Sequence, residues 1–324
     1  MLKFSKLRIA NITNKKISTK CQINMNKPDI LIIGAGPAGL TTAIQLKRYD
    51  LTPILLEKDS VGGLLRNANL VENYPGFPNG IPGPRLIALF EKQIRRIGVE
   101  VTFDEVTDID FDGGLFSVEA KRNTYHASRI IIATGTKPKP FPIEIPTQAG
   151  ERVFSEVWPL RNVRGRQIVI VGAGDAAFDY ALNLAGRGNT VTILNHGHEI
   201  HCLPLLWERA RAIPSITYRD KTTIQRIETD VHTNHLILIT DNCSLNTNYL
   251  LFAIGREPQT DFLSEHVKMQ ASALIESGKL YFVGDVHNGL FRQTAIAVGE
   301  GLQAAMQIYQ IVGRIGNPPC EEDR

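Results

Sequence analysis

Hydrophobic and polar positions along the chain follow two periods, that of short buried strands and that of amphipathic helices. An unbroken apolar run at residues 30–33 predicts a strand that is buried on both faces. Apolar positions at helical spacing continue to about residue 48, and a second strand is predicted at 52–57. This order of strand, helix and strand predicts a parallel sheet with helices packed against it.

Two glycine-rich turns stand in this pattern, each between a predicted strand and a predicted helix. The first is Gly34-Ala-Gly-Pro-Ala-Gly39, and the second is Gly172-Ala-Gly-Asp-Ala-Ala177. In such a turn the glycines permit the tight bend and let a pyrophosphate approach the backbone, where the helix start offers unpaired N–H groups. Glu57 ends the second strand, where its carboxylate can accept hydrogen bonds from ribose hydroxyls. We therefore predict a dinucleotide site at the first turn.

The remaining pattern repeats this arrangement and predicts two domains. We expect further strands at 99–103, 115–119, 130–135, 190–194, 236–239, 249–255 and 280–285, a strand from residue 167, and helices at 86–97, 176–185 and 294–312. The proline-rich stretch 136–142 is expected to be a stiff linker. The predicted class is α/β, with two Rossmann-like, three-layer ββα nucleotide-binding domains, the second inserted in the first. The expected bounds are 28–140 with 275–315 for the first domain, 141–274 for the inserted domain, and 316–324 for a tail.

Length and charge narrow the class of protein. The chain has 324 residues, of which 43% are hydrophobic, and this suits two domains with real cores. It has no apolar run long enough to span a bilayer, so no membrane span is expected. Residues 1–27 carry basic residues and no acidic ones, which leaves the rest mildly acidic and argues against a nucleic-acid partner. We expect 1–27 to be a disordered extension, with organelle targeting by residues 1–24 as the alternative.

The cysteines are few and dispersed. They are Cys21, Cys202, Cys243 and Cys320, and no two stand in a C-x-x-C pair. Such usage suits a reducing compartment, so we expect a cytoplasmic protein. A bond between Cys202 and Cys243 stays open on the sequence, although an unpaired buried cysteine is the expected state.

Several separate segments, in the right order, resemble one known family. Gly62-Gly-Leu-Leu65 and Val71-Glu-Asn-Tyr-Pro-Gly76 are similar to a flavin-cradling segment, and Ala133-Thr-Gly135 is similar to a sheet-crossing motif. Val283-Gly-Asp285 and Arg292-Gln-Thr-Ala295 resemble a second FAD signature. Together these segments resemble the FAD/NAD(P)-linked flavoprotein reductases, in particular the small thioredoxin reductase-like branch.

The resemblance implies that the first turn holds FAD. It implies that Asp285 holds the ribityl chain and that the helix start near Thr294 faces the flavin, where its N–H groups would stabilise negative charge. The FAD residues implied by turn and resemblance together are Gly34, Gly36, Pro37, Ala38, Gly39, Glu57, Lys58, Gly63, Leu64, Asn73, Val106, Ala133, Thr134, Gly135, Gly284, Asp285, Arg292, Gln293 and Thr294.

The chain departs from thioredoxin reductases where their C-x-x-C stands. That stretch reads Ser155-Glu-Val-Trp158 here, and disulfide exchange requires thiolates that serine and tryptophan do not have. We therefore expect the flavin itself to be the redox group, with no protein nucleophile. Trp158 is expected either to pack over the flavin ring or to serve in ordinary interdomain packing. Glu156 and His287 are weak candidates for a proton donor.

The second glycine turn also departs from the family. The run Asn195-His-Gly-His-Glu-Ile-His201 lacks the arginines that grip the 2′-phosphate of NADPH in thioredoxin reductases, and Asn195 is not an acid. Three alternatives stay open: loosely bound NADH, a second FAD or another adenine nucleotide, or a domain that has kept only its fold. Asp175 would repel a nearby pyrophosphate. The residues predicted for a second nucleotide are Gly172, Gly174, Asp175, Ala176, Asn195 and His196.

Three histidines gather in the same run. His196, His198 and His201 suggest a metal site, with Cys202 as a further ligand, but their spacing matches no common zinc pattern. We therefore expect a polar loop over a nucleotide groove and no metal.

The predicted function is that of an FAD-dependent oxidoreductase without a redox-active disulfide. Electrons would pass through the flavin, with NAD(P)H, ferredoxin or flavodoxin, or a small molecule as the electron partner. The resemblance implies a homodimer. The competing prediction is a flavin-based sensor or scaffold with a degenerate pyridine-nucleotide site.

Overall fold

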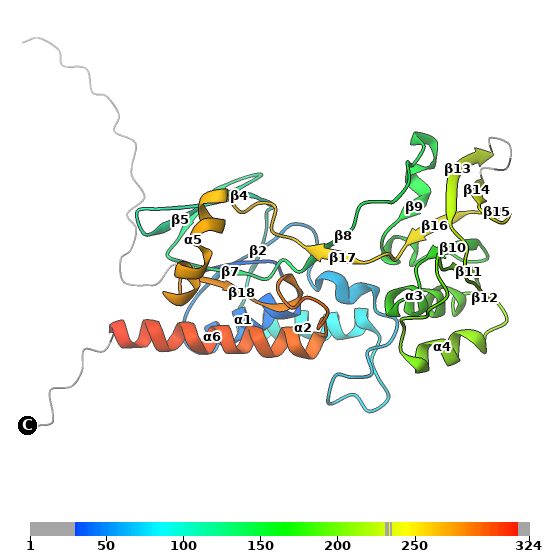
Figure 1. The fold of residues 1–324 in the computed structure, drawn as a ribbon. Coiled ribbons are helices and arrows are strands. Elements are labelled where there is room, and N and C mark those ends of the chain that lie inside the picture. Colours follow the sequence, from blue (N-terminus) through cyan, green and yellow to red (C-terminus); the bar gives the residue numbers. More distant parts are fainter. Residues whose placement is uncertain (1–29, 231–232, 234, 317–324) are drawn as a thin grey trace, which may run out of the picture.

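A computed structural model describes residues 30–230, residue 233 and residues 235–316 (Figure 1). The expected basic extension 1–27 lies outside these residues, and so does the expected tail, apart from Gly316.

The described chain alternates strands with helices. The α-helices are α1 (Pro37–Arg48), α2 (Gly83–Ile97), α3 (Asp175–Ala185), α4 (Pro204–Arg211), α5 (Glu265–Glu276) and α6 (Thr294–Gly316). The 3-10 helices are η1 (Gly63–Asn67), η2 (Thr147–Arg152), η3 (Trp158–Leu160) and η4 (Gly284–Val286). The strands are β1 (Ile30–Ile33), β2 (Ile54–Glu57), β3 (Val101–Phe103), β4 (Val106–Asp112), β5 (Leu115–Ala120), β6 (Thr124–Ala127), β7 (Arg129–Ile132), β8 (Thr136–Pro138), β9 (Val153–Phe154), β10 (Gln167–Val171), β11 (Thr190–Leu194), β12 (Ile216–Arg219), β13 (Ile224–Asp230), β14 (His235–Thr240), β15 (Ser244–Thr247), β16 (Tyr249–Phe252), β17 (Arg256–Pro258) and β18 (Leu280–Phe282).

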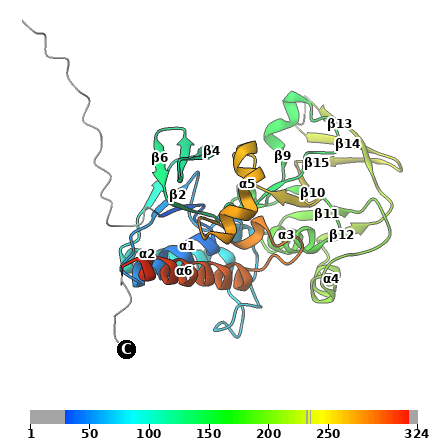
Figure 2. The same cartoon turned by 60° about the vertical axis from the view of Figure 1, so that its left-hand side comes forward.

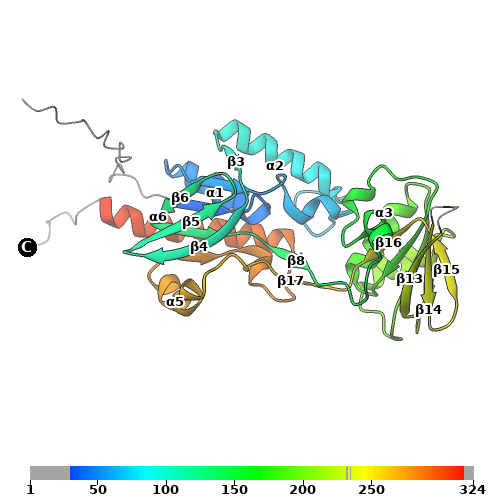
Figure 3. The ribbon, with the colours of Figure 1, turned by 90° about the horizontal axis from the view of Figure 1, so that it is seen from above.

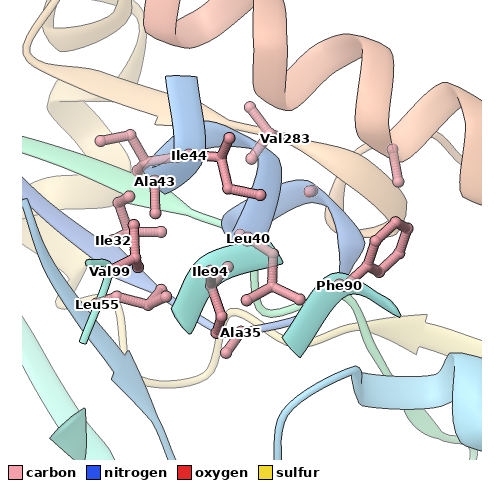
Figure 4. Close-up of a cluster of buried hydrophobic side chains, with 14 of the residues drawn as sticks. Ile32, Ala35, Leu40, Ala43, Ile44, Leu55, Phe90, Ile94, Val99 and Val283 are labelled. Atoms are coloured by element: carbon pink, nitrogen blue, oxygen red, sulfur yellow. The ribbon is translucent and has the colours of Figure 1, made fainter. Parts of the chain in front are cut away.

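The first domain has three layers around a parallel sheet. The sheet has the order β18-β7-β1-β2-β3, and an antiparallel sheet of β4, β5 and β6 lies on one of its faces. Helices α1, α2 and α6 gather on the other face (Figure 2). Because successive strand residues point to opposite faces, Ile30 and Ile32 of β1 pack with the helices, while Leu31 and Ile33 pack with the antiparallel sheet. The helix side of this core is drawn in Figure 4.

The second domain repeats the same three layers. Its parallel sheet has the order β12-β11-β10-β16-β9, and the antiparallel sheet of β13, β14 and β15 covers one face. Ile168 and Ile170 of β10 pack with α3, whereas Val169 packs with the antiparallel sheet. The predicted class, two Rossmann-like ββα domains of an α/β protein, is thereby confirmed.

Two short strands connect the domains. The proline-rich stretch that we expected to be a stiff linker forms β8, which pairs antiparallel with β17 on the returning chain (Figure 3). The return therefore lies near β17 and not at residue 275 as expected, because α5 already packs on the first domain. Val267 and Leu274 of α5 belong to the core that also holds Leu31 of β1. The expected boundary is corrected to the residues before Arg256.

The contact of α1 with α6 brings the two FAD signatures together. A Cβ atom on Gly301 of α6 would lie 2.3 Å from the carbonyl oxygen of Ala38 in α1, so only glycine fits. The Thr42 hydroxyl donates to the carbonyl oxygens of Ala38 and Gly301 at 2.9 and 3.1 Å. Among the described helices, none combines the length and apolar character needed to cross a membrane.

Candidate functional site

A cavity of about 690 Å³ extends from the first glycine turn to the start of α3 in the second domain. It is lined by every residue predicted for FAD except Gly39, which packs beneath the turn. The lining residues from that set are Gly34, Gly36, Pro37, Ala38, Glu57, Lys58, Gly63, Leu64, Asn73, Val106, Ala133, Thr134, Gly135, Gly284, Asp285, Arg292, Gln293 and Thr294. The fold thus collects segments from both ends of the chain around one space.

The three glycines of the first turn have different physical roles. Gly34 has a φ of +104°, and a Cβ atom there would lie 2.5 Å from the carbonyl oxygen of Ala133. A Cβ atom on Gly39 would lie 1.9 Å from the carbonyl oxygen of Gly34. At Gly36 a Cβ atom would meet no protein atom within 4 Å, and Gly36 lines the cavity. Gly34 and Gly39 are therefore required by the fold, whereas Gly36 leaves room for a ligand.

Helix α1 begins at this turn with its first N–H groups available. No side chain caps its N-terminus, and Pro37 contributes no N–H. The cavity therefore offers the positive end of a helix to a negatively charged group.

Glu57 lines the cavity and holds the turn in place. Its Oε2 accepts the N–H of Ala35 at 2.8 Å, and its Oε1 accepts the N–H of Asp59 at 3.0 Å. The side chain is only 8% exposed. A carboxylate oxygen has two acceptor positions, so each oxygen can accept one further hydrogen bond from a ligand hydroxyl.

Another part of the cavity lining comes from η4 and the start of α6, which pack against the start of α1. Gly284 donates its N–H to Glu300 Oε2 at 2.6 Å, and Asp285 lines the cavity beside it. Burial raises the pKa of Asp285, and the nearby Arg292 and Arg256 oppose that shift. The Nε atom of Arg292 is buried without a partner among the described residues. This part of the lining therefore holds a buried carboxyl group and an arginine nitrogen without a partner among the described residues.

His287 contacts the same glutamate as Gly284. Its Nε2 is 3.1 Å from Glu300 Oε2, and it is not among the residues that line the cavity. Its proximity to Glu300 gives it a structural role at the start of α6.

Sequence reasoning missed several lining residues because only the tertiary fold brings them to the cavity. Gln259, just after β17, accepts the Thr134 hydroxyl on its carbonyl oxygen at 2.7 Å. Arg256 of β17 donates to the hydroxyl and carbonyl oxygens of Thr136 at 2.9 and 2.8 Å. Asn67 of η1 also lines the cavity.

The segment that replaces the C-x-x-C contacts the first domain through Asn67. Glu156 lines the cavity, where its Oε2 accepts from Asn67 Nδ2 at 3.1 Å and its Oε1 lies 3.2 Å from Arg256 Nη2. The Trp158 N–H donates to Asn67 Oδ1 at 3.0 Å. The guanidinium of Arg161 covers the Trp158 ring, 5.0 Å from its centroid, and Trp158 does not line the cavity. Of our candidates in this segment, only Glu156 faces the predicted flavin site.

A second set of contacts joins the domains beside the cavity. Asp179 of α3 accepts the N–H of Asn69 at 2.9 Å. Arg209 of α4 forms a bidentate pair with Glu72, at 2.6 and 2.9 Å. Burial raises the pKa of Asp179 to about 6, and the nearby Asp175 adds to the shift. The inserted domain is thus held in this position in part by a carboxyl group whose pKa is raised to about 6.

We expect Asp179→Asn to remove a pH dependence from this contact. Because the folded pKa is raised above 3.8, the folded state binds the proton more tightly, so stability falls as pH rises from about 4 to about 6. The free energy of unfolding of the parent chain should fall by at most about 3 kcal/mol over this pH range because of Asp179, and Asp179→Asn should lack this contribution. Urea unfolding between these pH values measures the difference. Asp108→Asn on the exposed part of β4 is the control, and equal slopes for Asp179→Asn and the parent chain would contradict the account.

The second glycine turn copies the backbone of the first. Gly172 has a φ of +136°, and a Cβ atom there would lie 2.4 Å from the carbonyl oxygen of Ala253. A Cβ atom on Gly174 would meet nothing within 4 Å, as at Gly36. Asp175 and Ala176, at the start of α3, line the same cavity as the first turn, whereas Gly172, Gly174, Asn195 and His196 are not part of that lining.

The loop after β11 folds back across the second turn. His201 pairs with Gly174 as an isolated bridge, and the Leu203 N–H donates to Asp175 Oδ1 at 2.7 Å. Asn195 is 3% exposed, and its amide group bonds within the loop and to Tyr218. His196 is exposed. Asn195 thus anchors the loop, and the Asp175 carboxylate is already hydrogen-bonded.

The histidines and cysteines of the described residues form no metal site. No three His, Cys, Asp or Glu side chains in that part of the chain are grouped as metal ligands. His198 instead lies 3.0 Å from Asp220. Cys202 and Cys243 are both free thiols, so the disulfide left open by the sequence is not formed. Burial, followed by the charge of Asp175, raises the pKa of the Cys202 thiol, which makes it a poor nucleophile.

Comparison with known proteins agrees with this architecture. Residues 28–301 match the family model described as pyridine nucleotide-disulphide oxidoreductase. The thioredoxin reductase of Rickettsia felis is 30% identical over 315 residues, which cover 88% of this chain and 98% of that protein. The thioredoxin reductase of Chlamydia pneumoniae is 28% identical over 312 residues, with 88% and 98% covered.

Solved structures of thioredoxin reductases are also similar to this chain. A thioredoxin reductase of Lactococcus lactis in its FR conformation superposes with a TM-score of 0.76 at 27% identity, covering 89% of this chain and all of that one. A thioredoxin reductase of T. acidophilum has a TM-score of 0.74 at 25% identity, covering 88% and 99%. The chain belongs to the pyridine nucleotide-disulphide oxidoreductase family of FAD-dependent oxidoreductases, in its thioredoxin reductase-like branch.

Proposed function

We propose that this oxidoreductase passes electrons through one FAD held in the interdomain cavity and uses no redox-active disulfide. The observation that carries the proposal is the lining of the cavity, where the predicted FAD residues stand together with Glu156 in place of a dithiol. Ser155 and Trp158, at the two ends of that segment, have no sulfur atom.

The residues present fit FAD. Gly36 leaves the backbone open beside the uncapped start of α1, which suits a pyrophosphate. Glu57 has acceptor positions left for ribose hydroxyls, and Asp285 lines the same cavity, where it would hold the ribityl chain. When bound, the flavin supplies the redox chemistry, while the protein positions it and sets the local charge.

For the electron donor we propose NADH at the second turn. The helix start at Asp175 and Ala176 opens into the same cavity, so a nucleotide on this turn would have one end directed towards the first site. The loop 195–201 carries no arginine, which removes bidentate recognition of a 2′-phosphate and disfavours NADPH. The loop that bonds to Ala173 and Asp175 would have to shift, which predicts weak binding.

Anaerobic titration tests this proposal. We expect NADH to bleach the bound flavin at lower concentration than NADPH does. Gly174→Val should raise the NADH concentration required by about tenfold or more, since it places bulk where the pyrophosphate approaches the backbone. Gly150→Val, at a position with no protein atom near its Cβ and outside the cavity, is the control. An unchanged NADH response in Gly174→Val would remove the second turn from the mechanism.

A second candidate function follows from the loop that covers the second turn. If that loop keeps nucleotides out, the flavin is served by a carrier protein, or the chain acts as a flavin-based sensor. Flavin that resists both NADH and NADPH, yet is bleached by dithionite, would favour this candidate. A second FAD on the second turn would appear as two flavins per chain.

We also propose a homodimer through α6. Leu302, Met306 and Tyr309 lie along one side of this helix and are 39–45% exposed. We expect a solution mass of twice the 35.9 kDa chain, and monomers for Leu302→Glu/Met306→Glu, because charges disrupt an apolar interface. Met269→Glu on α5 is the control, since Met269 is 77% exposed elsewhere. Light scattering that gives one mass for all three proteins would refute the α6 interface.

A further inference from the structure

Four arginines gather at the edge of the second domain where β10 begins and α3 ends. Arg161, Arg164 and Arg166 belong to the segment between η3 and β10, and Arg187 follows the end of α3. The Arg166 N–H donates to Asn189 Oδ1 at 3.0 Å, which brings this segment beside the end of α3. We call these four side chains the arginine patch.

No acidic side chain among the described residues forms an ion pair with the arginine patch. None of the four forms an ion pair with any described residue, and residues 157–174 contain no acidic residue. Arg164 Nη1 instead donates to the carbonyl oxygens of Arg161 and Val163, at 3.1 and 2.8 Å. Arg161, Arg164 and Arg166 are exposed.

Arg187 adds a partly buried charge to the arginine patch. Its Nη1 is buried with no hydrogen-bond partner among the described residues. Burial, together with the charge of Arg164, lowers the pKa of Arg187. Like charges beside one another oppose folding, and no ion pair with a described residue offsets that repulsion. The patch is therefore better explained by an external anion than by stability.

The arginine patch is connected to the cavity through two contacts. The Arg161 guanidinium lies over the Trp158 ring, and the Trp158 N–H donates to Asn67, which lines the cavity. A molecule that binds the patch thus rests against the segment that stands beside the proposed flavin site.

We propose that the arginine patch is the docking surface for an acidic protein, namely an electron carrier that exchanges electrons with this enzyme. The inference rests on the proposed function and adds its partner. Guanidinium groups bind carboxylates in a bidentate manner, and complementary charge steers two proteins together. A nucleic acid is a poorer fit, because the chain apart from residues 1–27 is mildly acidic and the patch has too few cations to follow a phosphate backbone.

The test uses the full chain with its flavin and an acidic [2Fe–2S] ferredoxin as the probe. Calorimetry should detect saturable binding at about 0.01 M salt and much weaker binding at about 0.15 M, where the Debye length falls from about 30 to about 8 Å. Arg161→Gln/Arg164→Gln/Arg166→Gln should bind at least about tenfold more weakly at low salt. Arg85→Gln/Arg96→Gln/Arg211→Gln removes the same charge elsewhere and should bind as the parent does.

Three results would overturn the docking surface. They are no saturable binding of ferredoxin by the parent chain, equal binding by the two triple variants, and tighter binding of a short single-stranded RNA than of ferredoxin. Flavin content and NADH bleaching are measured on the same samples. If these persist while binding fails, the docking surface is wrong and the flavin function stands. If the flavin is absent, the proposed function fails as well.

Discussion

Gly36→Val is expected to give a folded protein that has lost its flavin. A Cβ atom at this position meets no protein atom, so the fold has no reason to fail, but the side chain fills the space where the pyrophosphate meets the backbone. Steric overlap of this kind costs about 1–3 kcal/mol or more, which corresponds to FAD binding that is weaker by about fivefold to 150-fold or more. Flavin absorbance after dialysis, together with circular dichroism, measures both parts of the prediction.

Gly39→Val is expected to destabilise the fold itself, and not only to weaken flavin binding. Its Cβ atom would lie 1.9 Å from the carbonyl oxygen of Gly34, so the helix would have to move away from the strand. We expect the free energy of unfolding to fall by about 3 kcal/mol or more, with or without added FAD.

Flavin retained by Gly36→Val at the parent level would show that the pyrophosphate does not lie at this turn.

Removal of all four cysteines is expected to leave flavin reduction by NADH within about twofold of the parent rate, because no thiol takes part. The replacements are Cys21→Ser, Cys202→Ser, Cys243→Ser and Cys320→Ser. The parent chain itself should not reduce thioredoxin, since Ser155 and Trp158 offer no attacking thiolate.

The number of electrons taken up per flavin shows directly whether a disulfide takes part in the redox chemistry. Dithionite titration of the parent should end at two electrons per flavin, the capacity of the flavin alone. Ser155→Cys/Trp158→Cys is the matched variant, and it should accept two more if its thiols form a disulfide. Four electrons in the parent, or loss of flavin reduction in the cysteine-free chain, would contradict a mechanism without a disulfide.

The cofactor cavity was largely predictable because its signals are local. The apolar run before Gly34, the glycine spacing and the acid at Glu57 all lie within one strand-turn-helix-strand unit. The later segments, such as the one that ends at Asp285, were found only through resemblance to a family. Nothing in the spacing of these segments along the chain shows that they meet.

The rest depended on tertiary contacts that the sequence pattern does not encode. Helix α5 was missed because few of its residues are buried, Val267 and Leu274 among them, which leaves a weak helical period. The domain boundary was misplaced for the same reason. The contact of Asp179 with Asn69 joins segments from different domains, and no local rule predicts it. Asn195 was expected to face a nucleotide, but burial makes it an anchor of its own loop.

The central claim is that one FAD in the interdomain cavity is the redox group of this chain. Extraction of flavin from purified protein, followed by its quantification against protein concentration, tests that claim most directly. We expect one FAD per chain, lost in Gly36→Val and kept in Gly150→Val. A parent chain that remains without flavin after incubation with excess FAD, or that holds two per chain, would contradict it.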